Sequence, residues 1–171
     1  MLHVALLEPE IPPNTGNIAR LCAATGARLH LVGRLGFRID DKSLKRAGID
    51  YWDAVDVVRH ATFDEFESYS GGFTRRPDDS LEPSTAGEPA AICRIWCVET
   101  PADMPYTRAA FADGDCLLFG CESIGLPAAV RAKYAGRLLG IPMPTGAVRS
   151  LNLATAAGVV LYEALRQLRD W

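Results

Sequence analysis

Six short apolar runs recur along the chain, separated by polar loops or by segments with helical spacing. Apolar runs of strand length that alternate with such segments favour a parallel sheet of the α/β class. We predict strands at 3–7, 28–32, 54–58, 91–98, 116–119 and 138–141. No internal repeat is visible, so the pattern predicts one α/β unit.

Residues suited to helix ends mark the predicted helices. The first helix is expected to begin near Asn14 or Thr15, either of which can cap it, and to stop at Gly26. Pro12-Pro13 keeps the preceding loop extended. Further helices are predicted at 41–47, 63–69 and 151–169, the last with Ala154, Ala157, Leu161, Ala164, Leu165 and Leu168 along one face.

The length of 171 residues suits a single domain covering residues 1–171. Residues 70–89 are rich in Gly, Ser, Pro and acidic side chains, and we predict a flexible surface insertion there. A linker between two domains is disfavoured, because neither flank alone completes the α/β alternation. Neither a leader-like start nor an apolar run of membrane-spanning length is found, so we expect a cytoplasmic protein without a membrane partner.

The cysteines and histidines do not show the spacing of a metal site. The five cysteines are odd in number, form no CxxC pair and mostly fall within apolar runs, which predicts buried free thiols: Cys22, Cys93, Cys97, Cys116 and Cys121. His3, His30 and His60 lie far apart in the sequence and match no ligand pattern with the cysteines. We therefore predict structural roles for these histidines and no bound metal.

Basic residues concentrate near the N-terminus, although the net charge is −3. Seven of them fall between Arg20 and Arg46, against two acidic residues in the same stretch. From composition alone, a solvated face and a nucleic-acid contact are equally good interpretations of this stretch.

Common enzyme motifs are missing from the chain. The run from Gly120 to Gly125 approaches a nucleophile elbow, but Cys121 stands where that motif needs its first glycine, and all three histidines precede Ser123. A serine hydrolase is therefore disfavoured. Neither G-x-G-x-x-G nor a Walker loop occurs, which also disfavours a dinucleotide or nucleoside-triphosphate enzyme.

Three loops that follow predicted strands carry polar residues: Asn14, Arg20, Glu122, Ser150 and Asn152. Each has a structural explanation of its own. Asn14 and Ser150 can cap helices, Asn152 can occupy a first turn, Glu122 can be a surface carboxylate and Arg20 can pair with an acid. Their joint placement at strand ends, where α/β sheets bind ligands, nevertheless predicts one shared site.

At these residues the chain resembles the SPOUT superfamily of methyltransferases, and within it the TrmL-type tRNA (cytidine/uridine(34)-2′-O)-methyltransferases. The resemblance covers nearly the whole chain and is carried by Glu8 to Cys22, Arg46 to Tyr51, Phe119-Gly120 with Glu122 and Gly125-Leu126-Pro127, Ser150 to Leu153 and Val160 to Ala164. It implies a parallel sheet with helices on both faces, a deep trefoil knot near the C-terminus and a homodimer.

The resemblance also implies a cofactor and an RNA partner. S-adenosyl-L-methionine is expected at Val98, Gly120, Ile141, Met143, Ser150 and Leu151, with S-adenosyl-L-homocysteine as product. The matching catalytic residues are Arg20, Ser150, Asn152, Asn14 and Glu122. A guanidinium stays protonated, so Arg20 is expected to bind phosphate and stabilise an alkoxide, while Ser150 or an RNA phosphate relays the proton. The expected tRNA contacts are Arg34, Arg38, Lys42, Lys45 and Arg46.

The expected reaction is 2′-O-methylation of the wobble nucleotide, a cytidine or 5-modified uridine, in leucine tRNAs. Methylation at another tRNA or rRNA position, a noncatalytic RNA-binding role and a small-molecule methyltransferase stay open as alternatives. Two departures from the family pattern bear on the RNA face. Ile124 stands where many relatives have a basic or polar residue, and the 70–89 segment is longer than in compact relatives.

Overall fold

A computed structural model describes residues 1–37, 54–70, 73–75, 81–83, 92 and 94–169. Its centre is a sheet of seven parallel strands in the order β3-β2-β1-β8-β6-β9-β7. The strands of this sheet are β1 (His3–Leu7), β2 (Arg28–Val32), β3 (Val57–His60), β6 (Arg94–Val98), β7 (Met104–Pro105), β8 (Asp115–Phe119) and β9 (Leu138–Gly140). The predicted parallel α/β class is confirmed.

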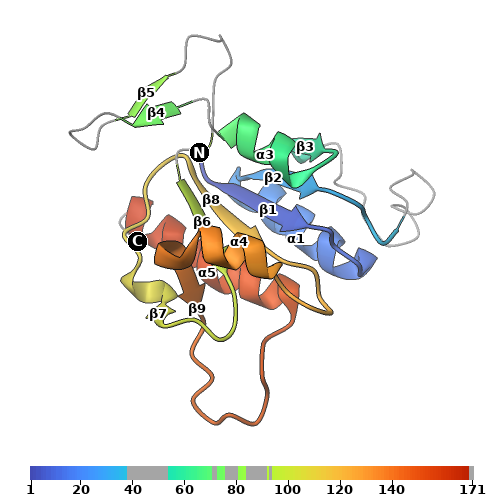
Figure 1. The fold of residues 1–171 in the computed structure, drawn as a ribbon, viewed down its shortest axis with the longest axis vertical. Helices are drawn as coiled ribbons and strands as arrows, with labels where there is room; N and C mark the ends of the chain where they lie inside the picture. Colours follow the sequence, from blue (N-terminus) through green and yellow to red (C-terminus); the bar gives the residue numbers. More distant parts are fainter. Residues whose placement is uncertain (38–53, 71–72, 76–80, 84–91, 93, 170–171) are drawn as a thin grey trace.

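Helices cover both faces of this sheet, as expected. They are α1 (Pro12–Thr25), α3 (Phe63–Ser70), α4 (Ala128–Lys133) and α5 (Leu153–Arg169), with 3-10 turns η2 (Tyr106–Arg108) and η3 (Ala135–Arg137). Figure 1 shows α4 and α5 on opposite sides of the central strands. A separate antiparallel pair, β4 (Phe73–Arg75) and β5 (Leu81–Pro83), stands away from the sheet.

Alternate residues of β1 enter the two hydrophobic cores. Val4 and Leu6 pack with the core that contains α1 and α5, whereas Ala5 and Leu7 pack with the core that contains Phe66 of α3 and Val130 of α4. All five residues of this strand are buried, as is usual for parallel strands with helices on both faces. The buried strand fixes where the loop after Leu7 emerges.

Helix α1 begins earlier than predicted. Its N-cap is Ile11, and Pro12 and Pro13 occupy the first turn, where proline loses no hydrogen bond. The prediction of Asn14 or Thr15 as the cap is therefore wrong, and Asn14 lies inside the first turn. The predicted end at Gly26 is confirmed, because Gly26 takes a left-handed conformation with φ of 71°.

Helix α5 begins later than predicted, at Leu153. The Asn152 side-chain oxygen accepts hydrogen bonds from the backbone N–H groups of Ala154 at 2.9 Å and Thr155 at 3.3 Å. Asn152, rather than Ser150, therefore caps this helix. On the predicted apolar face Leu168 is exposed, and Val160 takes a buried position that the face prediction omitted.

The remaining differences concern short or polar strands. The predicted strand at 54–58 is observed as β3 at Val57–His60, since the polar Arg59 and His60 continue its pairing with β2. Within the range predicted at 91–98, the strand starts at Arg94. The two-residue strand β7 and the helix α4 were not predicted.

Some predictions lie outside the described residues. These are the helix at 41–47, most of the proposed insertion at 70–89, and the side chains of Cys93, Arg38, Lys42, Lys45 and Arg46. In the part of the chain that is described, no helix combines the length and apolar character needed to span a bilayer.

The strand order brings together the loops that were predicted to share one site. Strands β1, β8, β6 and β9 are consecutive neighbours in a parallel sheet, so their carboxyl ends share one edge. The loops that leave this edge start at Glu8, Gly120, Glu99 and Ile141. In open α/β sheets this edge is the usual ligand side.

Candidate active site

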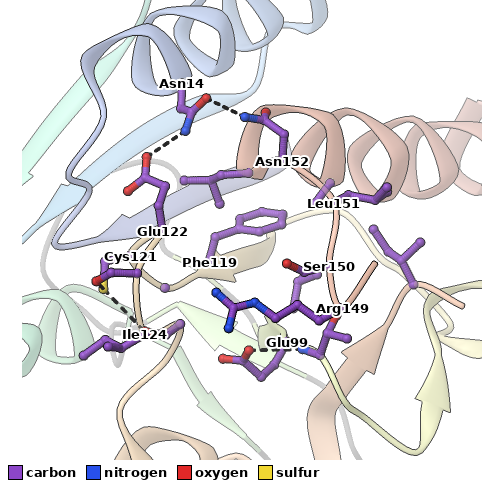
Figure 2. A pocket seen from close by; sticks show the side chains of 18 of the residues that line it. Asn14, Glu99, Phe119, Cys121, Glu122, Ile124, Arg149, Ser150, Leu151 and Asn152 are labelled. Atoms are coloured by element: carbon purple, nitrogen blue, oxygen red, sulfur yellow. Dashed lines mark hydrogen bonds between the residues drawn. The ribbon is translucent and has the colours of Figure 1, made fainter. Parts of the chain in front are cut away.

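A cavity of about 360 Å³ lies at the carboxyl ends of β6, β8 and β9. Its volume falls within the range of small-molecule sites. All six residues predicted to bind the cofactor line it: Val98, Gly120, Ile141, Met143, Ser150 and Leu151. The buried ring of Phe119 and the side chain of Leu153 add apolar wall, and Figure 2 shows the Ser150 hydroxyl directed into the cavity.

A chain of hydrogen bonds joins the first turn of α1, the loop after β8 and the start of α5 along one side of this cavity (Figure 2). The Asn14 side-chain nitrogen donates to Glu122 Oε1 at 3.0 Å, and the Asn14 side-chain oxygen accepts from Asn152 Nδ2 at 2.9 Å. Because Asn152 also caps α5, its amide is oriented at both ends. Three of the predicted catalytic residues, Asn14, Glu122 and Asn152, therefore form one connected unit.

Glu122 and Glu10 tie the loop after β1 to the loop after β8. The Glu122 carboxylate accepts the backbone N–H of Glu10 at 2.8 Å and that of Ile11 at 3.2 Å. In return, the Glu10 carboxylate accepts the Ser123 backbone N–H and hydroxyl, both at 2.9 Å. Reciprocal bonds of this kind fix the relative position of the two loops before any ligand enters.

Gly120 permits a close crossing inside the loop after β8. A β-carbon at this position would lie 2.1 Å from the Gly125 carbonyl carbon and 2.3 Å from the Leu126 nitrogen. Cys121 and Gly125 also pair across the loop as an isolated bridge. The loop therefore folds back tightly and presents its backbone to the cavity.

Glu99 is a residue of the cavity wall that was not predicted from the sequence. Its Oε2 accepts the Leu126 backbone N–H at 2.7 Å, and its Oε1 accepts the Thr100 N–H at 3.1 Å. It thereby links the end of β6 to the loop after β8. Its place directly after a predicted strand, like that of polar residues in the other loops, was the signal that could have found it.

Arg149 is a second missed residue, and it directly precedes Ser150. It lines the main cavity and also a neighbouring cavity of about 290 Å³, whose walls include Pro101, Pro142 and Gly140. The two cavities share Thr100, Ile141, Met143 and Arg149. Glu99 and Arg149 thus add a negative and a positive side chain to a wall that also holds Glu122 and that mixes polar with apolar groups.

Arg20 is not among the residues that line the cavity. It lies on α1, is exposed to solvent, and is separated from Asn14 by six positions, which places the two on different helix faces. Arg34 is exposed on the loop after β2. The loop after β2 contacts the loop after β1, since the Gly36 N–H donates to the Pro9 carbonyl at 2.9 Å.

The thiols fully enclosed in the core do not contribute nucleophiles. Burial raises the pKa of Cys22 and of Cys97 to about 12, and it raises that of Cys116 well above the ordinary value. Cys121 differs from the prediction of buried thiols, because it is partly exposed in the cavity wall. Within the described residues, no group of three or more candidate ligands is placed to hold a metal ion.

Comparison with known proteins identifies relatives of the whole chain. The family model described as "SpoU rRNA Methylase family" matches residues 1–72 and 80–162. The chain is 44% identical over 169 residues to the tRNA (cytidine(34)-2′-O)-methyltransferase of Escherichia coli strain K12, covering 98% of this chain and 94% of that protein.

Solved structures extend the comparison to the fold. One, described as "Structural insights into the 2-OH methylation of C/U34 on tRNA", has a TM-score of 0.81 and 43% identity, covering 100% of this chain and 98% of that one. Another is the SpoU methyltransferase AviRb of Streptomyces viridochromogenes in complex with the cofactor AdoMet. It has a TM-score of 0.75 and 30% identity, covering 98% of this chain and 60% of that one.

Proposed function

This chain belongs to the SpoU rRNA Methylase family, and from that membership we propose that it transfers a methyl group from S-adenosyl-L-methionine to the ribose 2′-oxygen of nucleotide 34 in tRNA. The observation that carries the proposal is the cavity at the carboxyl edge of β6, β8 and β9. Its wall combines the six expected cofactor residues with the Glu122–Asn14–Asn152 chain.

The residues present fit such a cofactor. The cavity offers apolar side chains and exposed loop backbone for a nucleoside, and it carries both signs of charge for the amino-acid part. We assign cofactor binding to Val98, Gly120, Ile141, Met143, Ser150 and Leu151. When bound, S-adenosylmethionine supplies a methyl group already activated by a sulfonium leaving group, so the protein must mainly position the ribose and handle its proton.

The chain's own residues divide these tasks. Asn14, Glu122 and Asn152 hold the start of α1, the loop after β8 and the start of α5 together, because their side chains bond to one another and Glu122 also accepts the Glu10 N–H. Ser150, whose hydroxyl faces the cavity, is the group we assign to relay the 2′-hydroxyl proton, alone or with an RNA phosphate.

We assign Arg20 to an RNA phosphate and to the charge that develops on the ribose oxygen. Its exposed position on α1 favours contact with the RNA backbone over contact with the cofactor. The test compares Arg20→Ala and Arg20→Lys by single-turnover methyl transfer with tRNA and cofactor both saturating. A drop of about 100-fold or more for Arg20→Ala, partly restored by Arg20→Lys, is expected; near-normal turnover of Arg20→Ala would remove the assignment.

The expected knot and homodimer also belong to this proposal. Strand β9 follows β6 and β7 in the chain yet pairs between them, an insertion that is compatible with threading of the C-terminal segment. We propose a dimer because a second copy would extend the RNA surface that a single α/β unit offers. Sedimentation velocity is expected to give twice the mass of one chain, and a monomer at micromolar concentration would contradict the dimer.

The target address is proposed to be the wobble cytidine or 5-modified uridine of leucine tRNAs, in the cytoplasm. An rRNA ribose is the second candidate, because the family description names rRNA. The tRNA target is preferred since the relatives named for position 34 match this chain over nearly their full length.

The deciding experiment supplies labelled S-adenosylmethionine to total tRNA from a strain that lacks the endogenous activity, and then maps the labelled nucleotide. Label at the 2′-oxygen of nucleotide 34 in leucine tRNAs is expected. Label at another nucleotide would support the methyl-transfer reaction and contradict the proposed target nucleotide. If neither tRNA nor rRNA accepts a methyl group while the cofactor binds, the chain is a noncatalytic member of the fold.

A further inference from the structure

We propose that Glu99 and Arg149 form a clamp for the α-amino-acid end of the methyl donor. In this clamp the Glu99 carboxylate accepts hydrogen bonds from the α-ammonium group, and the Arg149 guanidinium donates to the α-carboxylate. The inference rests on the proposed function, because it names how that same site holds its cofactor.

Glu99 presents a fixed negative charge to the cavity. Its two backbone hydrogen bonds, to Leu126 and Thr100, use one lone pair of each oxygen, and a carboxylate oxygen can accept more than one bond. The carboxylate is also confined by Gly125, where an added β-carbon would lie 2.7 Å from Oε2. Within the part of the chain that the structure describes, Glu99 forms no ion pair with Arg149 or with any other cationic side chain.

Arg149 presents the complementary positive charge. It lines both cavities, and Figure 2 shows its side chain extending into the main cavity toward Glu99. A guanidinium donates two parallel hydrogen bonds to a carboxylate, a geometry that a lysine cannot reproduce. The part of the chain that the structure describes gives Arg149 no carboxylate partner.

Two opposite charges that share one wall without pairing suit a zwitterion between them. An α-amino acid carries an ammonium and a carboxylate on one carbon, so each end meets its opposite charge. When the ligand displaces water from Glu99 and Arg149, its ammonium and its carboxylate replace the lost hydrogen bonds. A neutral nucleoside lacking this end would leave both side chains unmatched. The clamp thus predicts a preference for ligands that carry the amino-acid end.

The test measures binding by titration calorimetry with two uncharged-sulfur ligands. S-adenosylhomocysteine carries the amino-acid end, and 5′-methylthioadenosine lacks it. The full-length wild-type chain is expected to bind S-adenosylhomocysteine at least about 10-fold more tightly, the equivalent of about 1.4 kcal/mol. Glu99→Gln and Arg149→Met should each weaken S-adenosylhomocysteine about 10-fold and leave 5′-methylthioadenosine within about twofold.

The control is Arg131→Met, which removes an exposed cation from α4 that does not line the cavity. It should leave both affinities unchanged. Glu99→Gln keeps one carbonyl oxygen for the Leu126 N–H, and Arg149 is exposed, so both variants are expected to fold; thermal unfolding checks this.

Four outcomes would overturn the clamp. Equal losses for both ligands would assign the two residues to loop structure alone. A loss for S-adenosylmethionine without a loss for S-adenosylhomocysteine would place Glu99 at the sulfonium. Weakened tRNA binding in Arg149→Met with unchanged cofactor affinity would make Arg149 a phosphate contact. If the wild-type chain binds neither S-adenosylmethionine nor S-adenosylhomocysteine, the proposed function itself fails.

Discussion

At the scale of single residues, Gly120 is the most restricted position of the site. The β-carbon of an alanine would overlap the Gly125 backbone at 2.1 Å, so the loop after β8 must shift to accept it. We expect Gly120→Ala to lower the free energy of unfolding by about 1–3 kcal/mol and to abolish cofactor binding. Urea denaturation and calorimetric titration measure the two effects.

The matched control for this prediction is Gly136→Ala in η3, where an added β-carbon meets nothing within 4 Å. Its unfolding free energy should stay within about 0.5 kcal/mol of the wild-type value. Equal unfolding midpoints for the two variants would show that the close crossing at Gly120 relaxes without cost.

The roles of single residues were only partly predictable from the sequence. Asn14 resembled a helix cap because that is the commonest local use of an asparagine before a helix. Its partners are 108 and 138 residues away, and local pattern carries no information about such contacts. The placement of Asn14, Glu122 and Asn152 on loops after predicted strands predicted a shared site, and the family resemblance assigned that site to catalysis, but neither gave the hydrogen bonds between them. Glu99 and Arg149 were not predicted because charged residues are common in loops and neither one belongs to a motif.

At the scale of secondary-structure elements, Asn152 serves both α5 and the site. Its oxygen caps the helix and its nitrogen donates to Asn14. We expect Asn152→Ala to lower the unfolding free energy by about 1 kcal/mol, whereas Asn152→Asp keeps the cap oxygen and most of the stability. Both variants should lose methyl transfer, because neither can donate to Asn14. An active Asn152→Asp enzyme would show that the cap alone is needed.

Three buried histidines connect the neighbouring strands β1, β2 and β3. His3 Nδ1 and His30 Nε2 are 2.9 Å apart, and His30 Nδ1 and His60 Nε2 are 3.0 Å apart, so β1, β2 and β3 are joined by one chain of rings. Burial lowers the pKa of His3 from 6.5 to about 4 and that of His30 to about 2, and it also lowers the pKa of His60. The predicted structural role of the histidines agrees with this placement.

The buried histidines predict acid sensitivity. The unfolded chain binds protons near pH 6.5 while the folded His3 resists protonation until about pH 4, so stability is full above pH 6.5 and declines as the pH falls. Between pH 8 and pH 5, His3 alone should remove about 2 kcal/mol of unfolding free energy. Urea denaturation across this range measures it. His3→Gln should flatten the curve, and an unchanged slope would contradict the explanation.

Elements were predicted best where the hydrophobic pattern is unbroken. The strands at His3–Leu7 and Arg28–Val32 match the predicted ranges, because each is a run of mostly apolar residues between polar neighbours. Strand β3 was displaced since Arg59 and His60 interrupt the apolar pattern, although His60 is buried by its ring contacts. A strand of two residues, like β7, has no period to detect.

At the scale of the whole molecule, the proposed tRNA surface lies on the carboxyl edge of the sheet. Arg34 is exposed on the loop after β2, which is hydrogen-bonded to the loop after β1 through Gly36 and Pro9. We expect Arg34→Glu to weaken tRNA binding and to reduce the slope of log K against log salt by about 1. Filter binding from low to moderate salt measures this slope, and calorimetry should show unchanged cofactor affinity.

The control for the tRNA prediction is Arg169→Glu. Arg169 is exposed at the far end of α5, away from the edge where that helix starts. The same charge change there should leave the salt slope unaltered. Equal effects of the two variants would mean that net charge, rather than a defined surface, governs tRNA affinity.

The order of strands in the sheet was beyond prediction from periodicity. The alternation of strands and helices predicted a parallel α/β sheet, but it does not indicate which strands are neighbours in that sheet. Strand β1 pairs with β2, its near neighbour in sequence, and also with β8, so the sheet grows in both directions from the first strand. This central position of β1 is what brings the loop after Leu7 beside the loop after Phe119.

The same arrangement sets an order of events during synthesis on the ribosome. The Glu10 N–H and the Glu122 carboxylate, which bond to each other in the folded site, are 112 residues apart in the sequence. Strand β1 therefore leaves the ribosome long before β8, one of its two neighbours in the sheet, has been translated. Until β8 is translated, one edge of β1 remains open to other chains, and such long-range pairing is slow. A nascent chain that ends before residue 156 lacks part of the cavity wall, so we expect no cofactor binding before the start of α5 has been made.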